Sequence, residues 1–208
     1  MITFEELKKN EAIRAYITKA DESLGALGYT EHSFAHVCQV AETAAYILEI
    51  LGHSEHDIEL VKIAGFMHDI GNVVNRKHHA EYGALLANQF LANTDMPLED
   101  RVVVVSAIGN HDEGSGVPVN AVAAAMILAD KADVRCSRVR NKDLSTFDIH
   151  DRVNYSVKKS ELTIDPDKTT IKLKLCVDTE FGSVMNYFEI FMERMLLCCK
   201  AAEKLGLQ

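Results

Sequence analysis

The sequence predicts a mostly α-helical protein, a helical bundle followed by a small C-terminal β-hairpin and a final helix. Three observations lead to this prediction. Apolar residues recur at three- and four-residue spacing over most of the first 134 residues, as in amphipathic helices. Serine, proline and glycine residues stand where such helices would begin and end. A single stretch near residue 170 changes to alternating apolar and polar residues, which is typical of a strand.

Six helical segments are expected before the hairpin. They cover residues 3–24, 31–51, 54–71, 78–93, 97–111 and about 118–134. Gly52 is suited to end the second segment, and the Ser54 hydroxyl is suited to cap the third. Pro97 stands in the first turn of the fifth, where its missing N–H costs nothing.

The hairpin is expected over residues 157–178 and the final helix over residues 183–206. In the second strand, apolar residues at 171, 173, 175 and 177 alternate with lysines and a cysteine, and Asp165-Pro166-Asp167 is typical of a turn. The last segment repeats Phe188, Phe191 and Met195 at helical spacing. No internal repeat or linker interrupts the chain, so a single domain over residues 1–208 is expected.

Composition narrows the classes of partner and compartment. The chain has 208 residues, of which 48% are hydrophobic and 25% charged, as in an ordinary globular protein. A net charge of −9 argues against a nucleic-acid polymer as partner. No run of eighteen apolar residues predicts a membrane span, and the charged N-terminus lacks the apolar centre of a signal peptide. Five cysteines without CxxC spacing suit a reducing compartment, so a cytoplasmic location is expected.

Asp130 is the most informative acidic residue. In a helix its neighbours three and four positions away include Met126, Ile127 and Val134, so the carboxylate projects from an apolar face. Burying a carboxylate without a partner costs roughly several kcal/mol or more of folding free energy. Asp130 is therefore expected to bind a cation, with a salt bridge to a lysine or arginine as the alternative.

Histidines fall at helix ends and on an apolar face in a way that suggests the same cation. His36 lies at the edge of the apolar stripe of the second helix, and His68-Asp69 closes the third. His79 opens the fourth helix and His111 closes the fifth. Imidazole and carboxylate groups without thiolates suit Mn, Fe, Ni, Co or Zn in an open catalytic site. Each histidine alone would be explained as a hydrogen-bonded core residue, whereas the set indicates a divalent metal site.

These residues resemble those of the HD-domain superfamily of metal-dependent phosphohydrolases. His36, then His68-Asp69 within FMHDIG, then Asp130 are similar in order and kind to the H…HD…D motif of that family. The segments HAEYGALLANQFL and IGNHDE resemble those of members that carry a second metal ion, and Asp130-x-x-Asp133 resembles a stretch of the cyclic-dinucleotide branch. The resemblance spans about residues 31–140, the expected metal-site core, and implies an HD-domain helical bundle.

The resemblance implies a dinuclear site and a hydrolytic reaction. Asp69 would bridge two divalent ions, the first also held by His36, His68 and Asp130 and the second by His79 and His111. A metal-activated hydroxide would then cleave a phosphomonoester or phosphodiester of a nucleotide or similar small metabolite. Asp69 and Lys131 are the predicted catalytic residues. The predicted substrate-binding residues are Arg138, Arg76 and Asn72, which replaces the lysine that usually follows HDIG.

Several alternatives stay open at this point. The basic residues could be solvated surface groups, and Asp112 could be a ligand, a partner of a ligand histidine or a helix-end acid. The HD fold also holds di-iron oxygenases with an overlapping ligand set, and signalling modules without turnover. A small phosphorylated substrate is the expected partner, no membrane is expected, and a homodimer is left open.

Overall fold

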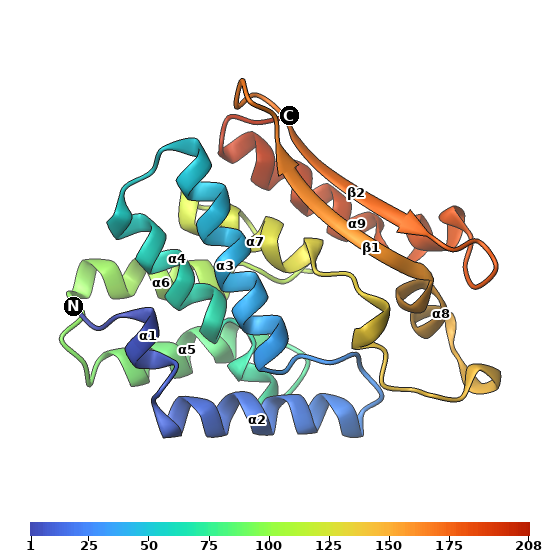
Figure 1. The fold of residues 1–208 in the computed structure, drawn as a ribbon. Helices are drawn as coiled ribbons and strands as arrows, with labels where there is room; N and C mark the ends of the chain where they lie inside the picture. The colour runs from blue at the N-terminus through green and yellow to red at the C-terminus, as the bar shows by residue number, and fades with distance from the viewer.

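The computed structural model describes residues 1–208 and confirms the mostly helical fold (Figure 1). The α-helices are α1 (Phe4–Leu7), α2 (Glu11–Ala26), α3 (Phe34–Leu51), α4 (Glu55–Met67), α5 (His79–Leu91), α6 (Leu98–Gly109), α7 (Ala121–Ala132), α8 (Ile149–Ser156) and α9 (Val184–Lys204). Short 3-10 helices lie at Ile70–Val73, Cys136–Arg138 and Leu144–Thr146. The hairpin and α9 lie together on the side of the bundle away from α2.

Helix bounds shift by up to four residues from those predicted, and three differences have a clear local cause. The first expected helix is two helices, because the Asn10 side chain accepts hydrogen bonds from the backbone of Ala12 and Ile13 and begins α2 anew. The sixth begins at Ala121, since Asn120 is its cap. Helix α8 was not predicted; its short length gives little periodicity, and it begins where the Asp148 side chain caps it.

The hairpin pairs β1 (Val157–Ile164) with β2 (Ile171–Val177) in antiparallel register. One face of it packs on the bundle, and the Ser160 hydroxyl donates a hydrogen bond to the carbonyl of Ala132 at 2.5 Å. The chain end returns to the turn, where the backbone of Gln208 pairs with Thr169 and Ile171. These contacts attach the hairpin to the C-terminal end of α7, the helix that carries Asp130.

Two glycines allow the helices that carry ligand-type residues to approach closely. A Cβ atom at Gly65 of α4 would lie 2.9 Å from the Cα atom of Ala41 in α3, so only glycine fits at this contact. A Cβ at Gly71 would collide with the backbone carbonyl of His79, at the start of α5. These contacts bring α3 against α4 and bring α5 against the segment that follows Asp69.

Helix α3 is long and apolar enough, by length and composition alone, to cross a membrane. In the structure it packs against α4 and α7 in the main hydrophobic core, and its buried face includes His36. A helix that packs in this way and carries a buried histidine toward several carboxylates is explained as the central helix of the bundle.

Candidate metal centre

Four nitrogen and oxygen atoms from α3, the end of α4 and α7 surround one point. The Nε2 atom of His68 is 3.1 Å from Asp69 Oδ2 and 3.7 Å from Asp130 Oδ1. The Nε2 atom of His36 is 3.6 Å from Asp69 Oδ2 and 3.3 Å from Asp130 Oδ1. Ligand atoms about 2.1 Å from one ion are about 3.0 to 3.4 Å apart at octahedral or tetrahedral angles. The observed separations are close to those of ligands that share an ion.

The other oxygen of Asp69 faces a second group of ligand-type residues. Asp69 Oδ1 is 3.7 Å from the Nε2 atom of His79 and 4.0 Å from that of His111. These two Nε2 atoms are 3.2 Å apart, and Asp112 Oδ1 is 3.9 Å from His79 Nε2. The six predicted ligands are thus brought together, with Asp69 between the two groups and Asp112 at the edge of the second.

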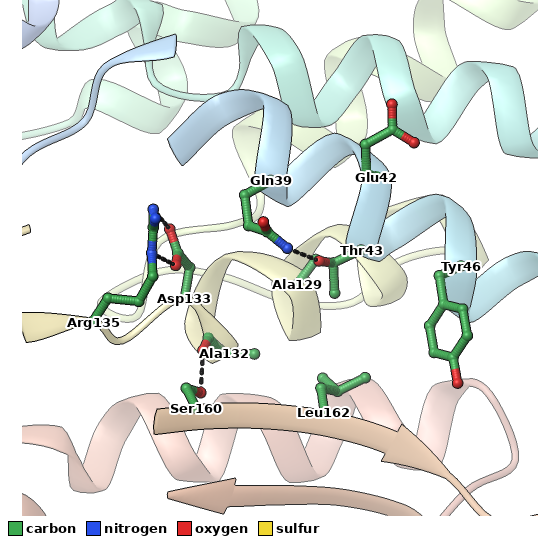
Figure 2. A pocket seen from close by; sticks show the side chains of 10 residues that line it. All are labelled: Gln39, Glu42, Thr43, Tyr46, Ala129, Ala132, Asp133, Arg135, Ser160 and Leu162. Carbon is green, nitrogen blue, oxygen red and sulfur yellow. Dashed lines mark hydrogen bonds and ion pairs between the residues drawn. The ribbon is translucent and has the colours of Figure 1, made fainter. Parts of the chain in front are cut away.

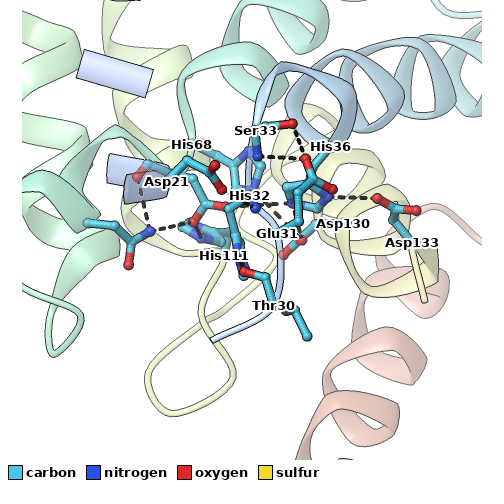
Figure 3. A network of polar contacts seen from close by, with 12 residues as sticks. Asp21, Thr30, Glu31, His32, Ser33, His36, His68, His111, Asp130 and Asp133 are labelled. Carbon is cyan, nitrogen blue, oxygen red and sulfur yellow. Dashed lines mark hydrogen bonds and ion pairs between the residues drawn. The ribbon is translucent and has the colours of Figure 1, made fainter. Parts of the chain in front are cut away.

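Hydrogen bonds donated by Nδ1 fix the orientation of all four histidine rings. Three donate to the carbonyl three residues earlier: His68 to Gly65 (2.7 Å), His79 to Arg76 (3.0 Å) and His111 to Ile108 (2.6 Å). His36 donates instead to the carboxylate of Asp133 at 2.8 Å (Figure 3). Since carbonyl and carboxylate oxygens accept, Nδ1 carries a proton and Nε2 points into the site.

The Nε2 atoms of His36 and His68 are buried and have no hydrogen-bond partner. Buried polar atoms are nearly always paired, so two buried nitrogen atoms without a hydrogen-bond partner beside two carboxylates indicate a cation site. The residues therefore fit a divalent metal ion, with nitrogen and oxygen ligands that suit a transition metal.

The electrostatics of the cluster favour a cation as well. Burial lowers the pKa of His68, but the carboxylates of Asp69 and Asp130 outweigh it and raise that pKa to about 10. Burial tends to raise the pKa of Asp69, yet the neighbouring histidines hold it well below its usual value. Both carboxylates are therefore ionised at neutral pH, and the attraction that binds a proton to His68 would also act on a metal ion.

The metal centre opens into a cavity of about 500 Å³, which is also lined by Arg76, Lys131 and Arg138. The Lys131 ammonium is buried, 2.8 Å from Asp130 and 3.4 Å from Glu113. Arg138 donates to the carbonyls of Glu31 and Asp133, so part of its guanidinium joins the loop before α3 to the end of α7. Arg76 has no carboxylate partner within ion-pair distance.

Asn72 is not placed as predicted. Its amide is buried and donates to both Oδ1 (2.9 Å) and the carbonyl (3.0 Å) of Asp69, and it does not line the cavity. The short asparagine side chain folds back onto the preceding turn, so nothing in the structure supports the predicted contact with substrate. Its position holds the Asp69 carboxylate in place between the two ligand groups.

The Asp133 carboxylate orients His36 from the side of the ring opposite the metal centre. It accepts from His36 and from Arg135, whose Nε atom is 2.5 Å away, and it also lies beside a separate cavity of about 370 Å³ between α3, α7 and β1 (Figure 2). Burial opposes ionisation, but hydrogen bonds from His36 and Arg135 lower the pKa of Asp133 to about 2. Asp133 belongs to the Asp130-x-x-Asp133 motif, but no role was predicted for it.

Glu113 and Arg194 also line the cavity and were not predicted. The Arg194 Nε atom donates to Glu113 at 2.9 Å, so α9 contributes directly to the wall above the metal centre. Burial opposes ionisation of Glu113, but Lys131 and Arg194 lower its pKa to about 2. Glu113 follows the predicted His111-Asp112 pair directly, which was the available signal; Arg194 has no comparable signal in the sequence.

The chain belongs to the HD domain family, whose model matches residues 33–151, more than half of its length. The HD superfamily is one of metal-dependent phosphohydrolases, and membership implies that the chain binds a divalent metal ion. The match ends within α8 and leaves the hairpin and α9 outside it.

Among known proteins, an uncharacterized protein of Methanocaldococcus jannaschii is 26% identical over 203 residues, covering 86% of this chain and 77% of that protein. Ribonuclease Y of Enterococcus faecalis is 27% identical over 122 residues, and Ribonuclease Y of Bacillus subtilis is 26% identical over the same length. Those matches cover 57% of this chain and 21% of each ribonuclease. No solved structure matches.

Proposed function

We propose that this protein is a metal-dependent phosphohydrolase that cleaves a phosphate ester of a nucleotide or similar small metabolite. One observation carries the proposal: the two oxygens of Asp69 face two groups of ligand atoms at the floor of a cavity that contains several cationic side chains. Such a floor suits an anionic group bound next to divalent ions.

The proposed site holds two ions. The first would be bound by His36, His68 and Asp130, the second by His79 and His111, and both by Asp69. Bound divalent ions supply Lewis-acid polarisation of phosphoryl oxygens and activation of water. Asn72 and Asp133 keep Asp69 and His36 oriented, so the ligands need little rearrangement.

Cationic side chains that line the cavity would bind the phosphate and neutralise its charge. Arg76, which lacks a carboxylate partner, is the strongest candidate to donate to phosphate oxygens. Lys131 has three N–H donors, of which two are directed to Asp130 and Glu113, leaving one for the substrate. In the overall reaction the oxygen of water bonds to phosphorus and the P–O ester bond breaks. One proton of the water leaves with the alcohol and the other stays on the phosphate.

The test is phosphate release under anaerobic conditions. Protein stripped of metal and reloaded with Mn, Fe, Ni, Co or Zn is assayed on p-nitrophenyl phosphate, bis(p-nitrophenyl) phosphate and nucleoside monophosphates. Hydrolysis with a redox-inert ion is expected, because the ion acts only as a Lewis acid. The iron form is also assayed in air. Oxygen uptake on a polyol or phosphonate, with no hydrolysis by any metal form, would instead establish an oxygenase.

A further inference from the structure

The inner part of the cavity above the metal centre has an excess of positive charge even without an ion. Apart from the α8 region, the buried and half-buried residues that line the cavity comprise four cationic side chains and three carboxylates. The cations are Arg76, Lys131, Arg138 and Arg194, and the carboxylates are Asp69, Glu113 and Asp130. Divalent ions would add to this excess. The inner part is therefore suited to a phosphate group.

The mouth of the same cavity has the opposite charge. Asp148 and Asp151 of the α8 region and Glu193 of α9 line it, and none of these three carboxylates has an ion-pair partner. Asp148 and Glu193 are exposed, and Asp151 is half-buried. The Tyr29 ring, 44% exposed, also lines the cavity. The mouth thus offers hydrogen-bond acceptors and one aromatic face.

The unpartnered, buried Nε2 atoms of His36 and His68 fix the direction in which a substrate would lie. They lie behind Asp69 and Asp130, the carboxylates that line the floor of the cavity. The reacting phosphate would therefore lie at this floor, and the rest of the substrate would extend toward the mouth. A cavity of about 500 Å³ is within the range that encloses a small-molecule ligand.

Resting on the proposed function, we propose that the substrate is a small phosphomonoester whose other end carries N–H donors. The donor is a protonated amine or an amino-bearing nucleobase, and it hydrogen-bonds to the carboxylates of Asp148 and Glu193. Hydrogen bonds to charged acceptors are roughly twice as strong as neutral ones. The Tyr29 ring packs against the same group, as aromatic faces do with cations and bases.

The same carboxylates select against longer anions. A second phosphate, or the next phosphate of a polynucleotide, would lie near the carboxylates of the mouth. Repulsion between these negative charges would weaken binding of such substrates. Glu193 lies beyond residues 33–151, the part that matches the HD domain. Specificity therefore depends in part on α9, which this chain adds to the shared metal-binding core.

The experiment compares matched substrates by kcat/KM. O-phosphoethanolamine is paired with propyl phosphate, which lacks the amine, and guanosine monophosphate is paired with inosine monophosphate, which lacks one amino group. We expect about a tenfold or larger preference for the donor-bearing member of one pair, the scale of a hydrogen bond to a charged group. A preference in the first pair would identify the donor as a protonated amine, and a preference in the second would identify it as the amino group of a nucleobase. Guanosine triphosphate and a short RNA are expected to react at least about tenfold more slowly than the monophosphate.

The variants are Asp148→Asn, Glu193→Gln and their combination, with Glu189→Gln as control. Glu189 is an exposed acid of α9 that does not line the cavity. The combined variant should reduce the preference to less than about threefold and increase the relative rate on the triphosphate, because the charged acceptors are gone. Glu189→Gln should keep the wild-type preference. These exposed, shape-conserving changes leave the core intact, and circular dichroism checks the fold.

The outcomes separate the two proposals. Wild-type protein that hydrolyses p-nitrophenyl phosphate but treats both members of each pair alike overturns this inference and leaves the proposed function standing. The same holds if the preference persists in the combined variant, or if only bis(p-nitrophenyl) phosphate is cleaved. Absence of hydrolysis on every ester with every metal overturns both.

Discussion

Replacing Asp133 tests whether metal binding depends on the hydrogen bond behind His36. In Asp133→Asn the side chain keeps its shape, but its oxygen is neutral, so the bond from His36 Nδ1 loses charge assistance. Bonds to charged acceptors contribute about 1.5–3 kcal/mol and neutral ones about 0.5–1.5 kcal/mol. The difference of about 1 to 1.5 kcal/mol corresponds to about a tenfold weaker metal affinity. Asp133→Ala leaves Nδ1 unpaired and the ring free to turn, so a loss nearer to about a hundredfold is expected.

The assay is competition for Mn between the protein and a fluorescent chelator, with thermal unfolding of the metal-free forms measured in parallel. Arg135→Gln is the matched control, because it removes the other partner of the same carboxylate and leaves the bond to His36 in place. Its metal affinity should stay within about threefold of wild type. If both Asp133 variants bind Mn as tightly as the wild type, the orientation of His36 does not depend on Asp133 and the reasoning is refuted.

Three further predictions follow from the site and the core. Asp69→Ala should lose both bound metal and hydrolysis, and full metal occupancy by elemental analysis would contradict its shared position. His79→Ala and His111→Ala should each reduce metal content from two ions to one, and an unchanged ratio would show that these histidines hold no ion. Burial of the Tyr187 hydroxyl, which has no partner, raises its pKa to about 12. Because the unfolded side chain ionises near pH 10, about 3 kcal/mol of stability should be present below pH 10 and lost as the pH rises through 12. Denaturant titrations of Tyr187→Phe should lack this alkaline loss, and an identical loss in the variant would assign it elsewhere.

The sequence was sufficient to predict the fold class, because helices depend on local patterns, and the six residues predicted as metal ligands lie together in the structure. Apolar spacing and capping residues define the helices. His68, His79 and His111 stand at helix ends, where each ring bonds to a carbonyl three residues earlier in the chain. The Asn10 break and α8 were missed because a single side-chain cap overrides periodicity in short segments.

Contacts between distant segments could not be predicted in this way. Arg194 reaches the cavity because α9 packs against α7 and α8, and no spacing within the last helix indicates that contact. Asn72 was assigned to substrate from the residue it replaces, whereas its hydrogen bonds to Asp69 depend on the turn that the 3-10 helix makes.

The hydrogen bonds from three histidines to carbonyls three residues earlier have a consequence for the kinetics of metal uptake. The rings are held by their own stretch of backbone, so their rotational freedom is lost when the chain folds rather than when an ion arrives. Little side-chain entropy then opposes binding. The rate at which ions enter should accordingly be governed by shedding of their own hydration water and by passage through the cavity, and the folded chain should change little on loading.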